Sequence, residues 1–557
     1  MTHPHILAPV LSPDDLHNAL TASGEIAVID VRDLGVFARK HLLAAAPAPL
    51  AHLALVIGHL VPRADTPIVL TDLDESLVHT ARERLREWGY NRISILAGGT
   101  LAWEAAGFEV FSGVNVLSKA FGEIVEHEAG TPHIDVASLR ERIARHDNLV
   151  IVDGRTPEEF RNFSLPGAYS VPNAELPYRI RELAPDPDTL VVVNCAGRTR
   201  SIIGAQTLID AGVPNPVVSL KDGTMSWLLE GHTLDRGREH ALPEPAPENI
   251  AAARVNAAAF AKKVGVRTID DQELAAFEND DTRTLYRFDV RNAAEYRAGH
   301  LIGWRWAPGG QLVQATDEYI GTRGARVVLA DWDGVRAPTT AAWLAQLGGF
   351  EVYLYAPAAN APIETGDTPR RILRAATAPQ AGWIDVRSLH ALAQATAADG
   401  LTLRVFDVEK SVAFRDKHIE GAHFAAAGRL PALLADLTPE TSLVITSSDG
   451  VLAQVVATEL LRHGYPARAL LGGNRAWFDA NLPTASGGEH ILTGEDDSWH
   501  SGYAYTDEAQ RHAAFRAYLD WEVGLVEQLT QPGAVTAFNV AGRARDADLQ
   551  AAGTLAA

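Results

Sequence analysis

The sequence has very little sulfur, with one cysteine and two methionines among 557 residues. A single cysteine cannot form an internal disulfide, which favours a reducing, cytoplasmic compartment. No apolar run approaches the roughly 20 residues that a membrane-spanning helix needs, which argues against a membrane protein. The first residues lack a basic stretch followed by an apolar one, so no signal peptide is expected.

Positive charge is also scarce: 49 Lys and Arg stand against 70 Asp and Glu, and the formal net charge is −21. This balance argues against a nucleic acid or an anionic membrane as a partner. The 20 histidines show no spacing typical of metal ligands, and no glycine-rich nucleotide fingerprint follows a predicted strand. We therefore expect neither a metal nor a nucleotide cofactor. The sequence does not indicate an oligomeric state.

The chain is too long for one hydrophobic core, and it repeats itself. An apolar run that ends in an acid occurs four times, at residues 27–30, 150–153, 285–289 and 403–407. A second apolar run follows in each copy, and the next residue is Asp72, Cys195, Asp331 or Ser447. This position lies 42 residues after the acid in three copies and 40 in the fourth, and a glycine follows 17 residues later in all four. Such spacing predicts four tandem domains.

Within each copy, the predicted strands alternate with predicted helices. This order is typical of an α/β fold, with a mainly parallel central sheet flanked by helices on both faces. Proline- and alanine-rich stretches at 236–264 and 356–380 are expected to be linkers. The predicted divisions are four domains and a C-terminal helical extension, at residues 1–115, 130–235, 265–360, 380–488 and 489–557.

Cys195 stands where a reactive cysteine would be placed. It ends an apolar run, it is followed by a short loop that contains Arg198 and Arg200, and a helical pattern begins at residue 202. A helix N-terminus and two nearby guanidinium groups both favour the thiolate, which is the nucleophilic form of cysteine. We therefore expect Cys195 to be a catalytic nucleophile.

Three features together resemble the rhodanese family of sulfurtransferases. They are the Asp153-Gly154-Arg155 opening, the Leu165-Pro166-Gly167-Ala168 turn, and the strand, cysteine loop and helix around Cys195. The resemblance implies four tandem rhodanese-like domains and a loop cysteine that carries a persulfide. The other three domains have Asp72, Asp331 and Ser447 at this position. Neither Asp nor Ser can carry a sulfane sulfur, so these domains are expected to be non-catalytic.

The chemistry that the resemblance implies is a two-step transfer. Cys195 would attack the outer sulfur of an anionic donor such as thiosulfate, and a thiophilic acceptor such as cyanide, sulfite or a thiol would then take the sulfur. No cofactor is implied beyond this covalent persulfide. The loop amides would surround the persulfide as an anion-binding nest. These expected binding residues are Ala196, Gly197, Thr199 and Ser201.

Charged side chains are expected to complete the site. Arg198 and Arg200 would attract the donor and stabilise the leaving anion, although a loop this short cannot aim both inward. Asp153 and Arg155 would brace the loop from the neighbouring strand, or they form an ion pair with a structural role alone.

Two other functions are compatible with this site. A cysteine phosphatase or arsenate reductase also uses a strand, loop and helix, but it needs an arginine six residues after the cysteine. Here that residue is Ser201, and Arg200 comes one position earlier, so the loop is one residue short. The other alternative is a sulfur-relay or sensory binding module, in which the domains without cysteine dock a partner protein and Cys195 hands it sulfur.

Overall fold

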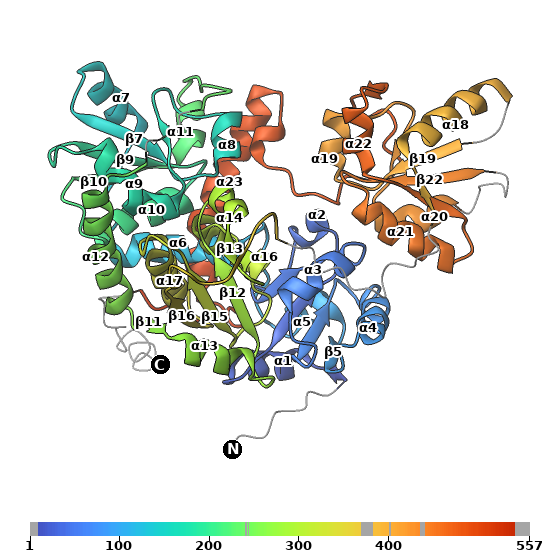
Figure 1. Ribbon diagram of the computed structural model, residues 1–557, viewed down its shortest axis with the longest axis horizontal. Coiled ribbons are helices and arrows are strands. Elements are labelled where there is room, and N and C mark those ends of the chain that lie inside the picture. Colours follow the sequence, from blue (N-terminus) through green and yellow to red (C-terminus); the bar gives the residue numbers. More distant parts are fainter. Residues whose placement is uncertain are drawn as a thin grey trace. The chain divides into compact units, whose positions relative to one another are not determined.

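The computed structural model describes residues 9–239, 242, 244–368, 382–399, 403–434 and 441–540. These residues form two compact units (Figure 1). The first unit contains the described residues within 1–22, 26–114 and 369–500, and the second contains those within 23–25, 115–368 and 501–557. The first and fourth repeats therefore share one unit. The second and third repeats share the other with the C-terminal extension. The finer division into five domains stays a prediction.

Each repeat contains a five-stranded sheet with all neighbouring strands parallel. In sheet order, the strands of the first repeat are β1 (Val10–Leu11), β5 (Ile93–Leu96), β4 (Ile68–Thr71), β2 (Ala27–Asp30) and β3 (Ala45–Pro47). Those of the second are β6 (His133–Ile134), β10 (Val217–Leu220), β9 (Leu190–Asn194), β7 (Leu149–Asp153) and β8 (Tyr169–Ser170).

The third and fourth repeats have the same strand order. The third contains β11 (Arg267–Ile269), β16 (Glu351–Tyr355), β15 (Arg326–Ala330), β12 (Leu285–Asp289) and β14 (Arg305–Trp306). The fourth contains β18 (Trp383–Ile384), β23 (Ala467–Leu470), β22 (Ser442–Thr446), β19 (Leu403–Asp407) and β21 (His423–Phe424). Two antiparallel pairs are added, β13 (His300–Leu301) with β17 (Ile363–Glu364) and β20 (His418–Ile419) with β24 (Thr484–Ala485).

Helices connect the strands. The first repeat has α1 (Pro13–Thr21), α2 (Leu34–Phe37), α3 (Leu53–Leu60), α4 (Val78–Glu87) and α5 (Gly99–Ala105). The second has α7 (Val136–Ala144), α8 (Pro157–Asn162), α9 (Leu176–Leu183), α10 (Thr199–Asp210) and α11 (Gly223–Leu229). The third has α13 (Asp271–Glu278), α14 (Ala293–Ala298), α15 (Gly309–Gln314), α16 (Thr316–Tyr319) and α17 (Arg336–Leu347). The fourth has α18 (Val386–Asp399), α19 (Ser411–Asp416), α20 (Leu430–Leu434), α21 (Val451–Arg462) and α22 (Gly473–Asp479).

The second repeat shows why the sheet is covered on both faces. Successive side chains of a strand point to opposite faces, so a strand buried on both faces is apolar throughout. Val191 and Val193 of β9 pack with apolar residues of α9 and α10. Val192, between them, packs on the other face with Val136 and Leu139 of α7. The fold class predicted for the repeats is therefore confirmed as parallel sheets flanked by helices.

Two helices lie between the repeats where no helix was expected. The predicted linker at 236–264 contains α12 (Pro247–Lys263), which packs on α9 and α17, with Ala257 and Phe260 buried. Its alanines favour helix, and Pro247 at the first turn costs no hydrogen bond. The stretch still connects the second and third repeats, but as a packed helix. The other helix is α6 (Val116–Ala129), which packs on α10 and on the C-terminal helix α23 (Glu508–Gln528). Part of the predicted linker at 356–380 lies outside the described residues.

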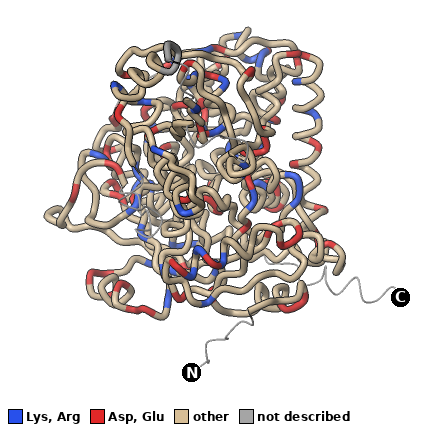
Figure 2. Tube along the Cα trace, turned by 90° about the vertical axis from the view of Figure 1, so that its right-hand side faces the viewer, with Lys and Arg blue, Asp and Glu red and all other residues tan. Residues whose placement is uncertain are grey.

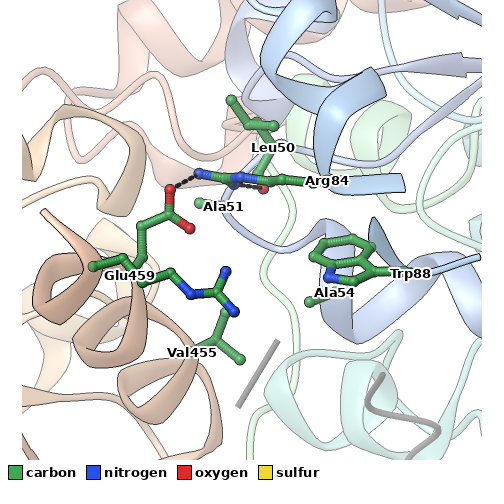
Figure 3. Close-up of a pocket in the computed structure, with 8 residues that line it drawn as sticks. Leu50, Ala51, Ala54, Arg84, Trp88, Val455 and Glu459 are labelled. Atoms are coloured by element: carbon green, nitrogen blue, oxygen red, sulfur yellow. Dashed lines mark hydrogen bonds and ion pairs between the residues drawn. The ribbon is translucent and has the colours of Figure 1, made fainter. Parts of the chain in front are cut away.

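Within the first unit, the first and fourth repeats meet around a small pocket (Figure 3). Arg84 of α4 pairs with Glu459 of α21 and also donates to the carbonyl of Leu50 at 3.0 Å. Trp88 and Val455 line the apolar side of the pocket. This contact joins helices that are distant in sequence, so the two repeats form one compact unit despite their separation along the chain.

Charged residues of both signs are interspersed along the trace (Figure 2). The acidic excess is therefore not confined to one segment of the chain. Among the described residues, no helix combines the length and the apolar character that crossing a bilayer requires.

Candidate functional site

Cys195 is the first residue after the central strand β9 and comes four residues before α10. Its side chain is 2% exposed, and its Sγ lies 3.5 Å from Ser201 Oγ. Ser201 Oγ in turn donates to the carbonyl of Arg198 at 2.8 Å, which closes the loop on itself. The fold therefore places the thiol at the carboxyl end of a parallel sheet, where such folds bind ligands.

The equivalent loops of the other repeats show what this loop geometry binds. The carboxylate of Asp72 accepts hydrogen bonds from the amides of Asp74, Glu75, Leu77 and Val78. The carboxylate of Asp331 accepts from the amides of Gly334, Val335 and Ala337. Ser447 Oγ accepts from the amide of Ala453 at 3.2 Å. In two repeats, the amides thus hold the carboxyl group of a side chain that is part of the loop itself.

The ionisation of Cys195 differs from the sequence-based expectation. Burial raises the pKa of the Cys195 thiol above its ordinary value, although the charge of Arg200 and hydrogen bonds from Ser201 act against this. The nearby carboxyl of Glu522 raises the pKa further. The loop groups Arg200 and Ser201 therefore favour the thiolate, as expected, but desolvation of the closed site disfavours it more strongly.

Arg198 is paired with three carboxylates. Its guanidinium pairs with Glu123 and Asp222 at 2.8 Å each, and it also pairs with Glu126. Burial raises the pKa of Glu123 to about 7, although Arg198 opposes this shift. Glu123 and Glu126 lie on α6, more than 70 residues before Arg198, so no local spacing in the sequence could reveal them.

Arg200 acts on the thiol through its charge, and its carboxylate partner among the described residues is Glu159. Its guanidinium donates to the two oxygens of Glu159 at 2.6 and 2.8 Å, and it reaches Gln311 of the third repeat at 3.5 Å. Burial alone would raise the pKa of Glu159, but the charge and hydrogen bonds of Arg200 lower it to about 2. Arg200 therefore keeps its positive charge beside Cys195. It is the better placed of the two predicted arginines.

Asp153 and Arg155 form a buried ion pair. The amide, Nε and Nη2 of Arg155 donate to the carboxylate of Asp153 at 2.8–3.0 Å, and both side chains are fully buried. The same ion pair joins Asp30 to Arg32 and Asp289 to Arg291 in repeats that have no cysteine. This favours the structural interpretation of the pair.

Residues of the C-terminal extension contact the cysteine loop, a role that could not be assigned from the sequence. Tyr503 donates to the carbonyl of Ala196 at 3.2 Å, and its hydroxyl lies 2.6 Å from Thr224 Oγ1. Thr199 Oγ1 donates to Glu522 Oε1 of α23 at 2.6 Å. Distant residues of the chain therefore complete the surroundings of the predicted binding residues.

Gly197 lies where the C-terminal helix α23 approaches the cysteine loop closely. A Cβ atom at this position would lie 3.2 Å from the ring of Tyr518 and 3.3 Å from Glu522 Oε2. The absence of a side chain at Gly197 thus allows the C-terminal helix to pack close to the loop. Gly223 has a different constraint, because its φ is +54° and a Cβ there would lie 2.4 Å from the carbonyl oxygen of Cys195.

Comparisons with known proteins agree with this geometry. The chain matches the family described as Rhodanese-like domain over residues 12–106, 135–230 and 271–358. The solved structure of a thiosulfate sulfurtransferase from Pseudomonas aeruginosa is 40% identical, with a TM-score of 0.90, and the similarity covers 96% of this chain and 100% of that one.

Two curated proteins match single stretches of the chain. A sulfurtransferase from Allochromatium vinosum is 32% identical over 115 residues, which are 21% of this chain and 95% of that protein. An HTH-type transcriptional regulator from Mycobacterium tuberculosis is 32% identical over 110 residues, which are 19% of this chain and 47% of that protein. The family match does not include the fourth repeat, so placing this repeat in the same family stays a proposal that rests on its strand order.

Proposed function

Because this chain belongs to the rhodanese family, we propose that it is a sulfurtransferase that moves a sulfane sulfur through a persulfide on Cys195. The supporting observation is the behaviour of the equivalent loops, whose amides hold a carboxylate at Asp72 and Asp331. In the second repeat, the same position holds the one thiol of the chain. A persulfide anion on Cys195 would occupy the place that the carboxylates fill in the other loops.

The proposed reaction has two displacement steps. The Cys195 thiolate attacks the outer sulfur of thiosulfate, a new S–S bond forms, and sulfite leaves with the electron pair of the broken S–S bond. A thiophilic acceptor then attacks the outer persulfide sulfur and releases the Cys195 thiolate. Arg200 would stabilise the anionic sulfur in both steps, because its charge lies beside the thiol. Arg198 would instead hold the loop through its carboxylate partners.

The test is Cys195→Ser, which removes the nucleophile and preserves the size of the side chain. After incubation with thiosulfate, intact mass should show about one added sulfur atom on the unmodified protein and none on the variant. Sulfur transfer from thiosulfate to cyanide should be lost together with the added mass. A variant that still gains sulfur or still turns over would contradict the proposal. A protein persulfide offered as the donor would separate a relay function from turnover of small molecules.

A further inference from the structure

The C-terminal helix α23 brings a carboxylate to the cysteine loop. Glu522 is 1% exposed, and its Oε1 accepts the hydrogen bond of Thr199 Oγ1 at 2.6 Å. Its Oε2 faces Gly197, since a Cβ built on that glycine would lie 3.3 Å from this oxygen. Glu522 thus approaches the same loop amides that are proposed to bind the persulfide.

The two cations near this carboxylate, Lys119 and Arg198, favour its charged form and also contact other groups. Arg198 pairs with Glu123, Glu126 and Asp222. The ammonium of Lys119, which attracts Glu522, lies over the rings of Tyr518 and Trp521 at 5.2 and 5.1 Å. A donor that reaches the loop therefore meets a carboxylate from α23 in a buried setting, where charges interact strongly.

We propose that Glu522 is a specificity-determining residue that disfavours dianionic sulfur donors relative to donors of lower charge. The inference rests on the proposed function, because it concerns entry of the donor into the Cys195 site. Thiosulfate brings two negative charges toward Glu522, whereas an aryl thiosulfonate brings one. Like charges placed together at a binding site select against the more highly charged ligand.

The experiment measures kcat/KM for both donors with the full-length protein and with Glu522→Gln, at about pH 9, because burial raises the pKa of Glu522 and a high pH favours its charged form. The amide of glutamine still accepts the hydrogen bond from Thr199. The ratio of thiosulfate to thiosulfonate efficiency should rise about 3- to 10-fold in the variant. The ratio isolates donor charge, because any change in the reactivity of Cys195 affects both donors.

Glu527→Gln is the matched control, because Glu527 lies on the same helix and is exposed. It should leave the ratio unchanged. If Glu522→Gln does not fold, Glu522→Met removes the same charge with a side chain of similar length and is expected to raise the ratio in the same way. An unchanged or lower ratio in a folded, active variant would overturn the inference. If the unmodified protein forms no Cys195 persulfide with either donor, the proposed function fails instead.

Discussion

At the scale of single residues, Asp153 and Asp407 occupy the same position in two repeats but are stabilised differently. Asp153 is paired with Arg155, whereas Asp407 accepts hydrogen bonds from the amide of Glu409 at 2.9 Å and from Asn474 at 2.8 Å. Without a cationic partner, burial raises the pKa of Asp407 from 3.8 to about 7. The folded protein therefore takes up a proton at this residue that the unfolded chain does not hold at the same pH.

This difference gives a prediction about stability. The stability associated with the protonated Asp407 is fully present at low pH and is lost as pH rises through about 7. Asp407→Asn should therefore stabilise the fourth repeat above neutral pH by a few kcal/mol, on the order of 3, and have little effect near about pH 4. Hydrogen exchange of the β19 and β22 amides would measure the local effect.

Asp153→Asn serves as the contrasting variant. It leaves the buried Arg155 without its carboxylate, so it should destabilise the second repeat by about 3–5 kcal/mol above neutral pH. If Asp407→Asn were equally destabilising above neutral pH, the burial of an unpaired carboxyl would not explain the behaviour of Asp407.

The two loop arginines should also respond differently to substitution. Because Arg200 opposes the upward shift of the Cys195 pKa, Arg200→Ala should move the pH midpoint of persulfide formation upward. We expect kcat/KM of this variant for thiosulfate to fall about 10- to 150-fold at neutral pH. A pH–rate profile of sulfur loading measures both effects.

Arg198→Ala provides the comparison for that profile. It should lower the melting temperature, because three carboxylates lose their cation, and it should leave the midpoint in place. A midpoint that moves equally in both variants would mean that Arg200 has no special relation to the thiol.

At the scale of elements, the strands were predictable and the helices between repeats were not. Most strands at the centre of a sheet are apolar runs with β-branched residues, and the second apolar run of the second repeat, 191–194, lies within β9. The α12 segment is alanine-rich without a clear apolar stripe, so its composition resembled that of a linker. Its burial depends on partners in α9 and α17, which the local pattern does not reveal.

The same reasoning applies to the candidate site. Cys195, Arg198 and Arg200 could be found from their spacing, because they lie within six residues of the chain, although Arg200 belongs to the first turn of α10 and not to the loop. Glu123 and Glu522 could not, because they reach this loop from α6 and α23, which precede and follow it at long distance in the chain. Burial of the thiol, and hence the direction of its pKa shift, depends on these distant elements.

The packing of α12 can be tested with one substitution. Phe260 is 1% exposed and meets Trp343 of α17 edge to face, with ring centroids 5.6 Å apart. Phe260→Ala should lower the free energy of unfolding by about 3–5 kcal/mol through the cavity that it leaves. Val255→Ala on the same helix is the control, since Val255 is 68% exposed and should change stability by less than about 0.5 kcal/mol. Equal effects in thermal unfolding would show that α12 does not contribute to the core.

At the scale of the whole molecule, the second and third repeats contact each other through arginines at equivalent positions. Arg200 pairs with Glu159 of its own repeat and reaches Gln311 of the third repeat. At the equivalent position, Arg336 pairs with Glu295 of its own repeat and with Glu175 of the second repeat at 2.7 Å. The second and third repeats therefore support each other's loops, although one of them has no thiol.

Restoring a cysteine elsewhere should not create an equivalent site. In Cys195→Ser/Asp331→Cys, the new thiol has Arg336 nearby, but Asp333 also pairs with this arginine. In Cys195→Ser/Ser447→Cys, the loop contains Asp449 and no arginine. We expect both variants to load sulfur at less than about a hundredth of the normal rate, the second more slowly than the first, because a nearby acid disfavours the thiolate. Mass spectrometry over time measures the loading, and a Ser447→Cys variant as fast as the unmodified protein would contradict the electrostatic explanation.

Because the chain has a single cysteine and this cysteine is buried, the reactivity of its thiol reports local opening of the structure. Cys195 is 2% exposed beneath residues of the C-terminal extension, and no second cysteine competes for a label. An alkylating reagent can therefore modify the chain only after the segment around Cys195 opens, provided that the fold is otherwise intact. When opening limits the reaction, the labelling rate becomes independent of reagent concentration and equals the opening rate. The rate at which the segment around Cys195 opens can thus be measured with iodoacetamide, and no other cysteine has to be replaced first.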